Sequence, residues 1–283
     1  MKLSIITINF NNREGLRKTI KSVVEQTWRK FEYIVIDGNS TDGSVDILED
    51  NSDDISYWVS EPDKGIYHAM NKGIDASHGD YLLFLNSGDY FYDNTVIQDI
   101  VNFNSCEDII IGKLLFLNNN EFSNVIAPIT MLRFYGGSIP HPATFIRRDL
   151  FKNNRFDENY KIVSDWKFFI QVLIIEECSY RIIDRCISCF ESGGISAENH
   201  ALIEKEKQEV LTDLLPYGVR LDYLHFLKGS NYTETEYDKF YVQLRKYKYA
   251  KIVYFFSVLF VRFISLFKKS ALFVNDFPLK LSN

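Results

Sequence analysis

Several signatures of nucleotide-binding and secreted proteins are missing from this 283-residue chain. It contains no P-loop and no G-x-G-x-x-G motif, so neither common glycine-rich phosphate cradle is present. Its four cysteines are too few for a disulfide framework, and the single C-x-x-C at Cys186 and Cys189 lacks the second pair that zinc would need. The first apolar run is too short for a signal peptide. These absences favour a cytosolic protein with reduced thiols.

Acidic residues are missing from one long stretch, between Asp238 and Asp276, although the whole chain has a net charge of −6. The same stretch is rich in basic side chains, namely Lys239, Arg245, Lys246, Lys248, Lys251, Arg262, Lys268 and Lys269. An acidic body followed by a basic, aromatic-rich tail suggests two parts with different surroundings. We therefore expect a domain at residues 1–200 and a helical extension at residues 201–283.

The first ninety residues alternate between short apolar runs and amphipathic segments. The pattern predicts strands at 3–8, 33–37, 55–61 and 81–85, and helices at 13–27, 45–50 and 65–77. Such βαβ alternation is typical of an α/β fold with a parallel sheet. The unbroken apolar run at 81–85 suits a central strand that is covered on both faces.

Each predicted strand ends at a polar or acidic residue, at Asn9, Asp37, Glu61 and Asp89 in turn. Any one of these residues could simply form a turn. The carboxyl ends of parallel strands lie at one edge of the sheet, however, and ligands of open α/β sheets bind at that edge. Four polar strand ends together therefore indicate a ligand site.

Four stretches occur in order within residues 1–197: "SIITINFNN", "IVIDGNSTDGS", "SEPDKGIYHAMNKGIDASHGDYLLFLNSGD" and "HPATFIRRDLF…FDENYKIVSDWKFF". Together they resemble the successive motifs of the family 2 glycosyltransferases, which are inverting enzymes that use nucleotide-activated sugars. The resemblance implies a GT-A fold, with a mainly parallel, Rossmann-like sheet flanked by helices. The sequence adds a C-terminal helical extension to that fold.

The resemblance implies a nucleotide site at the first two strand ends. Asp37 matches the family aspartate that accepts a hydrogen bond from the imide N–H of the base, which suits uridine, whereas the alternative is an Asx turn before Gly38. The base pocket is expected to include Thr7, Asn9 and Phe10, although Phe10 could equally belong to the core. Asp63 is expected to border the nucleotide, near its ribose or phosphates.

The family usually has D-x-D or D-x-D-D where this chain has Asn86-Ser87-Gly88-Asp89, so a single carboxylate remains. Mg²⁺ often uses one or two carboxylates together with water and substrate phosphates. We therefore expect Asp89 to hold Mg²⁺ or Mn²⁺ beside the nucleotide, and Asn86 to hydrogen-bond a ribose hydroxyl.

Asp165 aligns with the family's catalytic base, which takes the proton of the acceptor hydroxyl as that oxygen attacks C1 of the sugar. The alternative is that Ser164 or Asp165 only caps the helix that begins there. His141 and Trp166 are weaker candidates for the acceptor side.

The resemblance implies a hexosyl- or N-acetylhexosaminyltransferase that uses a nucleotide sugar, with UDP-sugar expected, and a glycan or lipid-linked acceptor in surface polysaccharide synthesis. It places the enzyme in the cytoplasm, at the inner face of the plasma membrane, with no nucleic-acid partner. The alternative is a catalytically idle protein that binds nucleotide sugars or acts as a scaffold, which the reduced D-x-D favours.

The basic tail has the pattern of an amphipathic helix. The apolar run from Ile252 to Phe267 is shorter than the about 20 residues that a span needs, and Arg262 interrupts it. A wide apolar face with a basic stripe predicts that residues 245–270 lie on a membrane surface. The alternative is a helix that packs on the protein's own core or in a homodimer.

Overall fold

The computed structural model describes residues 2–191 and 199–220. The predicted membrane segment, residues 245–270, lies outside the described residues, and so does most of the predicted extension. The chain divides into compact units at 1–223 and 224–283. The predicted domain boundary at residue 200 stays a prediction.

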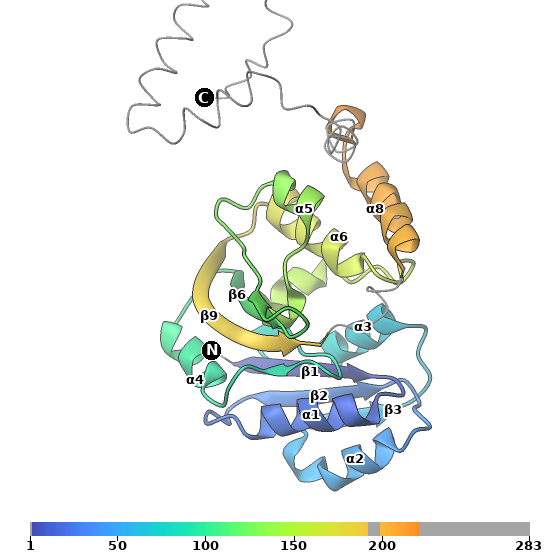
Figure 1. Ribbon diagram of the computed structural model, residues 1–283, viewed down its shortest axis with the longest axis vertical. Helices are drawn as coiled ribbons and strands as arrows, with labels where there is room; N and C mark the ends of the chain where they lie inside the picture. The colour runs from blue at the N-terminus through green and yellow to red at the C-terminus, as the bar shows by residue number, and fades with distance from the viewer. Residues whose placement is uncertain (1, 192–198, 221–283) are drawn as a thin grey trace, which may run out of the picture. The chain divides into compact units, whose positions relative to one another are not determined.

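The first half of the described fold has the predicted alternation of strands and helices (Figure 1). The elements are β1 (Leu3–Asn9), α1 (Arg13–Val24), β2 (Glu32–Asp37), α2 (Ser44–Asp50), the 3₁₀ turn Ser52–Asp54, β3 (Tyr57–Ser60), α3 (Ile66–Ala76) and β4 (Tyr81–Phe84). All the strands and helices expected there are confirmed. The ends differ from the sequence prediction by at most three residues, as is usual for helix and strand boundaries.

The second half adds shorter and mixed elements. These are β5 (Tyr90–Phe91), α4 (Val96–Phe103), β6 (Ile109–Phe116), β7 (Glu121–Phe122), α5 (Met131–Gly136), the 3₁₀ turn His141–Ala143, β8 (Thr144–Arg147) and the 3₁₀ turn Arg148–Lys152. After them come α6 (Ser164–Ile170), the π-helical turn Gln171–Ile175, β9 (Tyr180–Phe190) and α8 (His200–Leu214).

The strands of the described part form one sheet in the order β3-β2-β1-β4-β8-β6-β9-β5, with β7 paired to β6. β1 is parallel to both β2 and β4, and β2 is parallel to β3. Beyond β4 the sheet becomes mixed, because β8 is antiparallel to both β4 and β6. The parallel part therefore consists of the four strands that the sequence predicted, and the strand order reverses at β1.

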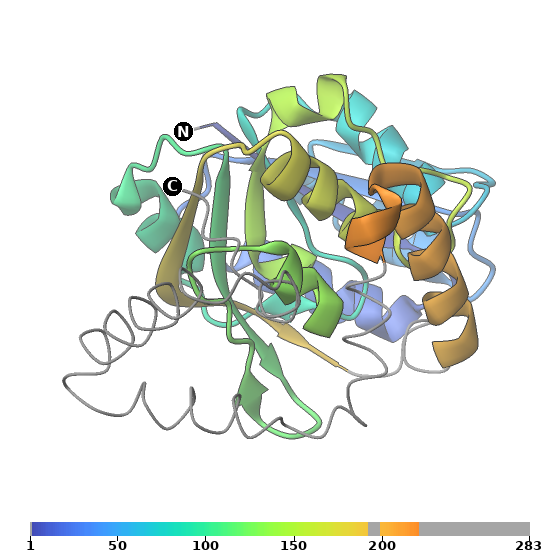
Figure 2. The same ribbon diagram turned by 90° about the horizontal axis from the view of Figure 1, so that it is seen from above.

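Both faces of the sheet are covered, which explains the unbroken apolar runs. Ile6 and Ile8 of β1 pack into the cluster that contains residues of α3, α6 and α8, whereas Leu3 and Ile5 pack into the cluster of α1, α2 and α4. In the view from above, α8 lies beside α6 (Figure 2).

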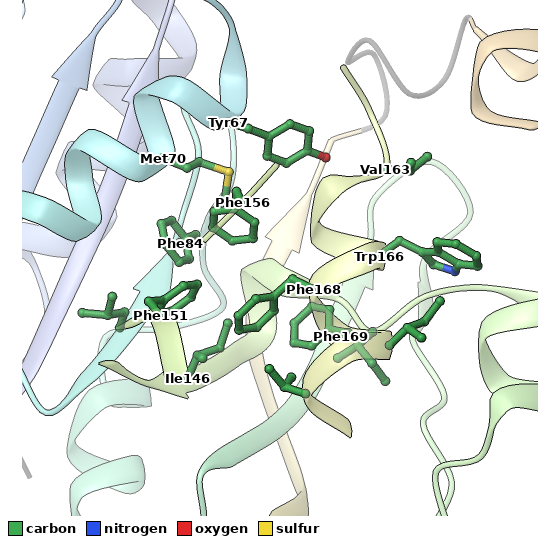
Figure 3. Packing of buried hydrophobic residues seen from close by; sticks show 14 of the residues in the cluster. Tyr67, Met70, Phe84, Ile146, Phe151, Phe156, Val163, Trp166, Phe168 and Phe169 are labelled. Carbon is green, nitrogen blue, oxygen red and sulfur yellow. The ribbon is translucent and has the colours of Figure 1, made fainter. Parts of the chain in front are cut away.

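Aromatic side chains fill the core between β4, α3 and α6 (Figure 3). Phe151 and Phe168 stack with their ring centroids 4.7 Å apart, and Phe84 meets Phe156 edge to face at 5.3 Å. Because this cluster joins the last parallel strand to the helix that carries Asp165, it fixes that helix relative to the sheet edge.

Helix α3 packs closely on β1 at Gly73. A Cβ atom at Gly73 would lie 2.4 Å from Cγ2 of Ile6, a fully buried and β-branched side chain that cannot move aside. We expect Gly73→Ala to lower the free energy of unfolding by about 1–3 kcal/mol, because overpacking outweighs the better helix propensity of alanine.

Urea denaturation would measure this effect, with Gly136→Ala as the control, because a Cβ at Gly136 meets no atom within 4 Å. Equal stability of the two variants would contradict the close packing of α3 on β1.

Candidate active site

The carboxylate of Asp37 lies at the end of β2 and is fully buried. Its Oδ1 accepts hydrogen bonds from Asn9 Nδ2 at 2.7 Å and from Ser40 Oγ at 2.6 Å. Its Oδ2 accepts from the backbone N–H of Ser40 at 2.8 Å and from Ser60 Oγ at 2.6 Å. Since Asn9 and Ser60 end the two neighbouring strands, this carboxylate ties three strand ends together.

The other residues predicted for the base pocket differ in exposure. Thr7 is fully buried, and its hydroxyl contacts the hydroxyl of Tyr33 and donates to the carbonyl of Leu85. Asn9 is 4% exposed, whereas Phe10 is 65% exposed. The structure therefore places Thr7 and Asn9 in the sheet and only Phe10 at the surface, where a ligand can reach it.

Asp89 lies in the turn that follows β4. The backbone N–H of Asp89 donates to the carbonyl of Asn86 at 2.8 Å, and Gly88 has φ +106, a conformation that favours glycine. Thr19 of α1 holds the turn, because its hydroxyl accepts from the N–H of Gly88 and donates to the carbonyl of Asp89.

The Asp89 carboxylate is buried without compensation. Its residue is 6% exposed, and no described residue donates a hydrogen bond to its oxygens. Burial raises the pKa of Asp89 to about 7, although the nearby charge of His141 acts in the opposite direction. A bound cation would therefore stabilise the ionised form of Asp89 strongly.

A second acceptor nearby is also unsatisfied. Oδ1 of Asn86 is buried and has no hydrogen-bond partner in the described part of the chain. An uncompensated carboxylate and an amide oxygen are both ligands that Mg²⁺ and Mn²⁺ accept, and substrate phosphates and water commonly complete such sites. The residues present therefore fit a divalent ion that is held jointly with the nucleotide. Within residues 2–191 and 199–220, no cluster of three or more acidic, His or Cys side chains forms a complete metal site.

Asp165 lies in the first turn of α6, and both of its oxygens are held. Oδ2 lies 3.0 Å from Nδ1 of His141, and Oδ1 accepts from the hydroxyl of Tyr67 at 3.1 Å. The helix begins after Val163 without a side-chain cap, so capping does not explain Asp165. Its side chain remains 16% exposed, which leaves the second lone pair of each oxygen available to a substrate hydroxyl.

His141 connects the two acidic positions. Its Nε2 lies 3.4 Å from Nδ2 of Asn86, in the turn that carries Asp89. Burial by itself lowers the pKa of His141, but the hydrogen bond and charge of Asp165, with the charge of Asp89, outweigh burial and raise that pKa. The structure thus brings Asp165, His141, Asn86 and Asp89 into one site.

Trp166 has a different place from the one predicted. It is 2% exposed, and its indole N–H donates to the carbonyls of Phe134 and Gly137. In Figure 3 its side chain extends from α6 on the side away from the ring of Phe168. Trp166 therefore joins α6 to α5, and its ring is not offered to an acceptor.

Two residues that sequence reasoning missed hold Asp165 in place. Tyr67 bridges from α3, with its hydroxyl also 2.5 Å from the carbonyl of Ile162. Glu206 of α8 is 4% exposed and accepts from the N–H groups of Lys161, Ile162 and Val163 at 2.8, 3.0 and 3.3 Å. An available signal for Glu206 was its helical spacing from Ile203 and Val210, which puts an acid on an apolar stripe.

A model of the family described as "Glycosyl transferase family 2" matches residues 4–163. The chain belongs to this family. The fold and activity that the motifs implied are thereby confirmed: the protein is a glycosyltransferase with a GT-A fold.

Two curated relatives from Mycobacterium tuberculosis align over most of their length. "Uncharacterized glycosyltransferase Rv1514c" is 33% identical over 76% of this chain and 82% of its own. "PGL/p-HBAD biosynthesis glycosyltransferase Rv2957" is 27% identical over 77% of this chain and 87% of its own.

Solved structures show the same fold at low identity. TarS 1–349 of S. aureus in complex with UDP-GlcNAc has a TM-score of 0.63 at 18% identity, covering 86% of this chain and 76% of TarS 1–349. The match covers 45% of a longer TarS chain. The mannosyltransferase PcManGT from Pyrobaculum calidifontis, in complex with GDP-Man and Mn²⁺, has a TM-score of 0.52 at 16% identity, covering 74% and 61% of the two chains.

In the described ranges, no helix has the length and apolar character needed to cross a bilayer.

The pKa of Asp89 predicts a pH dependence of stability for the metal-free protein. The folded protein keeps a proton on Asp89 up to about pH 7, whereas an unfolded aspartate releases it near its ordinary value of 3.8. Folding therefore takes up a proton between these values, and stability falls as the pH rises through that window. Asn at this position cannot ionise, so Asp89→Asn should gain stability relative to the wild type from about pH 4 to pH 7.

Urea denaturation in the presence of a chelator, at several pH values, would measure the difference between the two proteins. A difference that stays constant from pH 4 to pH 8 would show that the Asp89 carboxylate is not desolvated.

Proposed function

We propose that this glycosyltransferase inverts the anomeric centre as it moves a hexosyl or N-acetylhexosaminyl group from a UDP-sugar to a hydroxyl of a glycan or lipid-linked acceptor. The observation that carries the proposal is the geometry around His141, which contacts Asp165 on one side and Asn86, in the Asp89 turn, on the other. Asp165, whose carboxylate is held by hydrogen bonds and can take a proton, thus lies near Asp89. The Asp89 carboxylate has no hydrogen-bond donor among the described residues and suits a cation that also binds the diphosphate.

The reaction would be a single displacement. The acceptor oxygen forms a bond to C1 of the sugar as the bond from C1 to the diphosphate oxygen breaks, and the electrons of that bond leave with the nucleoside diphosphate. Asp165 takes the proton of the acceptor hydroxyl. His141 and Tyr67 hold the two carboxylate oxygens, and each oxygen would keep a lone pair for the acceptor hydroxyl.

Asp89 and Asn86 would hold the divalent ion, Mg²⁺ or Mn²⁺, together with the nucleotide. When bound, such an ion offsets the charge that develops on the departing diphosphate. The Mn²⁺ in the PcManGT complex supports this choice of cofactor, and the UDP-GlcNAc in the TarS complex supports a UDP-sugar donor.

The biosynthetic role of Rv2957, printed as PGL/p-HBAD biosynthesis, is compatible with a lipid-linked acceptor. A role in surface polysaccharide synthesis, at the inner face of the plasma membrane, would follow from such an acceptor. The amphipathic pattern of residues 245–270 supports it independently.

Loss of the base should abolish transfer but leave the donor bound. We expect Asp165→Asn to reduce kcat by about 10²–10⁴-fold, the usual effect of losing a general base. Affinity for UDP should change little, because Asp165 faces the acceptor.

Release of UDP from a panel of UDP-sugars, with lipid-linked acceptor present, would measure this effect. Asp184→Asn is the control, since its side chain is 88% exposed. Near-wild-type turnover by Asp165→Asn would remove Asp165 from the mechanism. Donor binding without any turnover by the wild type would favour the catalytically idle alternative.

The tail should bring the enzyme to an anionic membrane surface. Flotation with liposomes of anionic lipids should recover the full-length protein, whereas a chain that ends at Tyr247 should stay in the unbound fraction. Liposomes of neutral lipids, and high salt, should weaken the binding of the full-length protein because Lys and Arg contribute to it. Equal flotation of the two chains would contradict a membrane role for the tail.

A further inference from the structure

Gly38, directly after Asp37, leaves room for another side chain. A Cβ atom there would lie 2.5 Å from Oδ2 of Asp63 and 3.1 Å from Cδ2 of Phe10. The φ of Gly38 is not positive, so its backbone does not require glycine. What the missing Cβ permits is the approach of the Asp63 carboxylate.

One oxygen of the Asp63 carboxylate accepts a hydrogen bond from the protein, and the other does not, among the described residues. Oδ1 accepts from the backbone N–H of Gly65 at 2.8 Å, at the residue that precedes α3, and this contact fixes the direction of the side chain. Within the described ranges, Oδ2 has no hydrogen-bond donor. Asp37 has no free oxygen by comparison. Four donors hydrogen-bond to its two oxygens, and its side chain is fully buried.

The free oxygen of Asp63 lies beside an exposed aromatic surface, since Phe10 borders the same empty position and is 65% exposed. An apolar ring face with an acceptor oxygen at its side complements a planar heterocycle that carries an N–H on its edge. Uracil has such a group at N3 and guanine at N1. Cytosine and adenine have bare acceptor nitrogens at the equivalent edge, which a carboxylate repels.

We propose that Asp63, and not Asp37, is the carboxylate that selects the nucleobase, through Oδ2 and the ring N–H of a uracil. This inference rests on the proposed use of a nucleotide sugar. Asp37 then has a positioning role, because it holds the strand ends from which Phe10 and Gly38 extend.

Binding of UDP and of N3-methyl-UDP, measured by calorimetry on the full-length protein, tests the proposal. The methyl group replaces the proton that Asp63 would accept and leaves the diphosphate unchanged. The wild type should prefer UDP by about 10- to 100-fold, which is the usual effect of a hydrogen bond to a charged group. Asp63→Ala should bind the two nucleotides equally, with the weaker of the two affinities.

Two further variants separate base selection from local folding. Asp63→Asn keeps an acceptor for Gly65 N–H and offers an amide N–H in place of the free oxygen, so it should lose the preference for UDP and bind CDP better than the wild type does. Gly38→Ala should also lose discrimination, because its Cβ displaces Oδ2. Asp53→Asn, at an exposed position with the same change of charge, should behave as the wild type.

Full discrimination against N3-methyl-UDP by Asp63→Ala, at wild-type affinity for UDP, would overturn the assignment. The proposed function would fail in a different way, since the wild type and Asp53→Asn would then bind neither nucleotide.

Discussion

Four hydrogen bonds to the buried carboxylate of Asp37 hold together the carboxyl-terminal edge of the parallel strands β1, β2 and β3. A carboxylate without exposure to water is tolerated only when donors replace the lost hydration, and here Asn9, Ser40 and Ser60 provide them. Because Asn9 and Ser60 come from strands on either side of β2, the network fixes the relative positions of three strand ends. Phe10 and Gly38 follow those ends directly, so their placement depends on the same carboxylate.

The site contains acids in three different electrostatic states. Asp37 is saturated by donors, Asp165 is clamped by His141 and Tyr67 with lone pairs left over, and Asp89 is buried with no donor among the described residues. These states suit three different roles. A saturated carboxylate supports structure, a clamped one can accept a proton in a defined direction, and an uncompensated one attracts a cation.

The position of Asp165 depends on parts of the chain beyond the matched family region. Glu206 of α8 binds three successive backbone N–H groups just before α6, and the apolar residues Val210 and Leu211 of the same helix pack into the core beside α6. The aromatic cluster around Phe168 holds the other side of α6 against β4. The helix that carries the proposed base is therefore supported from both sides, which fixes Asp165 relative to the Asp89 turn.

The sequence by itself determined the strands and helices of the first half, the polar strand ends, the family, and the candidacy of Asp89, Asp165 and His141. These follow from local periodicity and from motifs, which act between neighbours in the chain. Only the tertiary structure decided which carboxylate oxygens remain without a hydrogen-bond donor. Asp37 and Asp63 look alike in sequence, as acids next to turns, but the donors that fill Asp37 come from residues up to 28 positions away. Long-range contacts also explain why Trp166 is buried and why Glu206 binds the loop before α6. Hydrogen-bond saturation and burial depend on long-range contacts that no local pattern encodes.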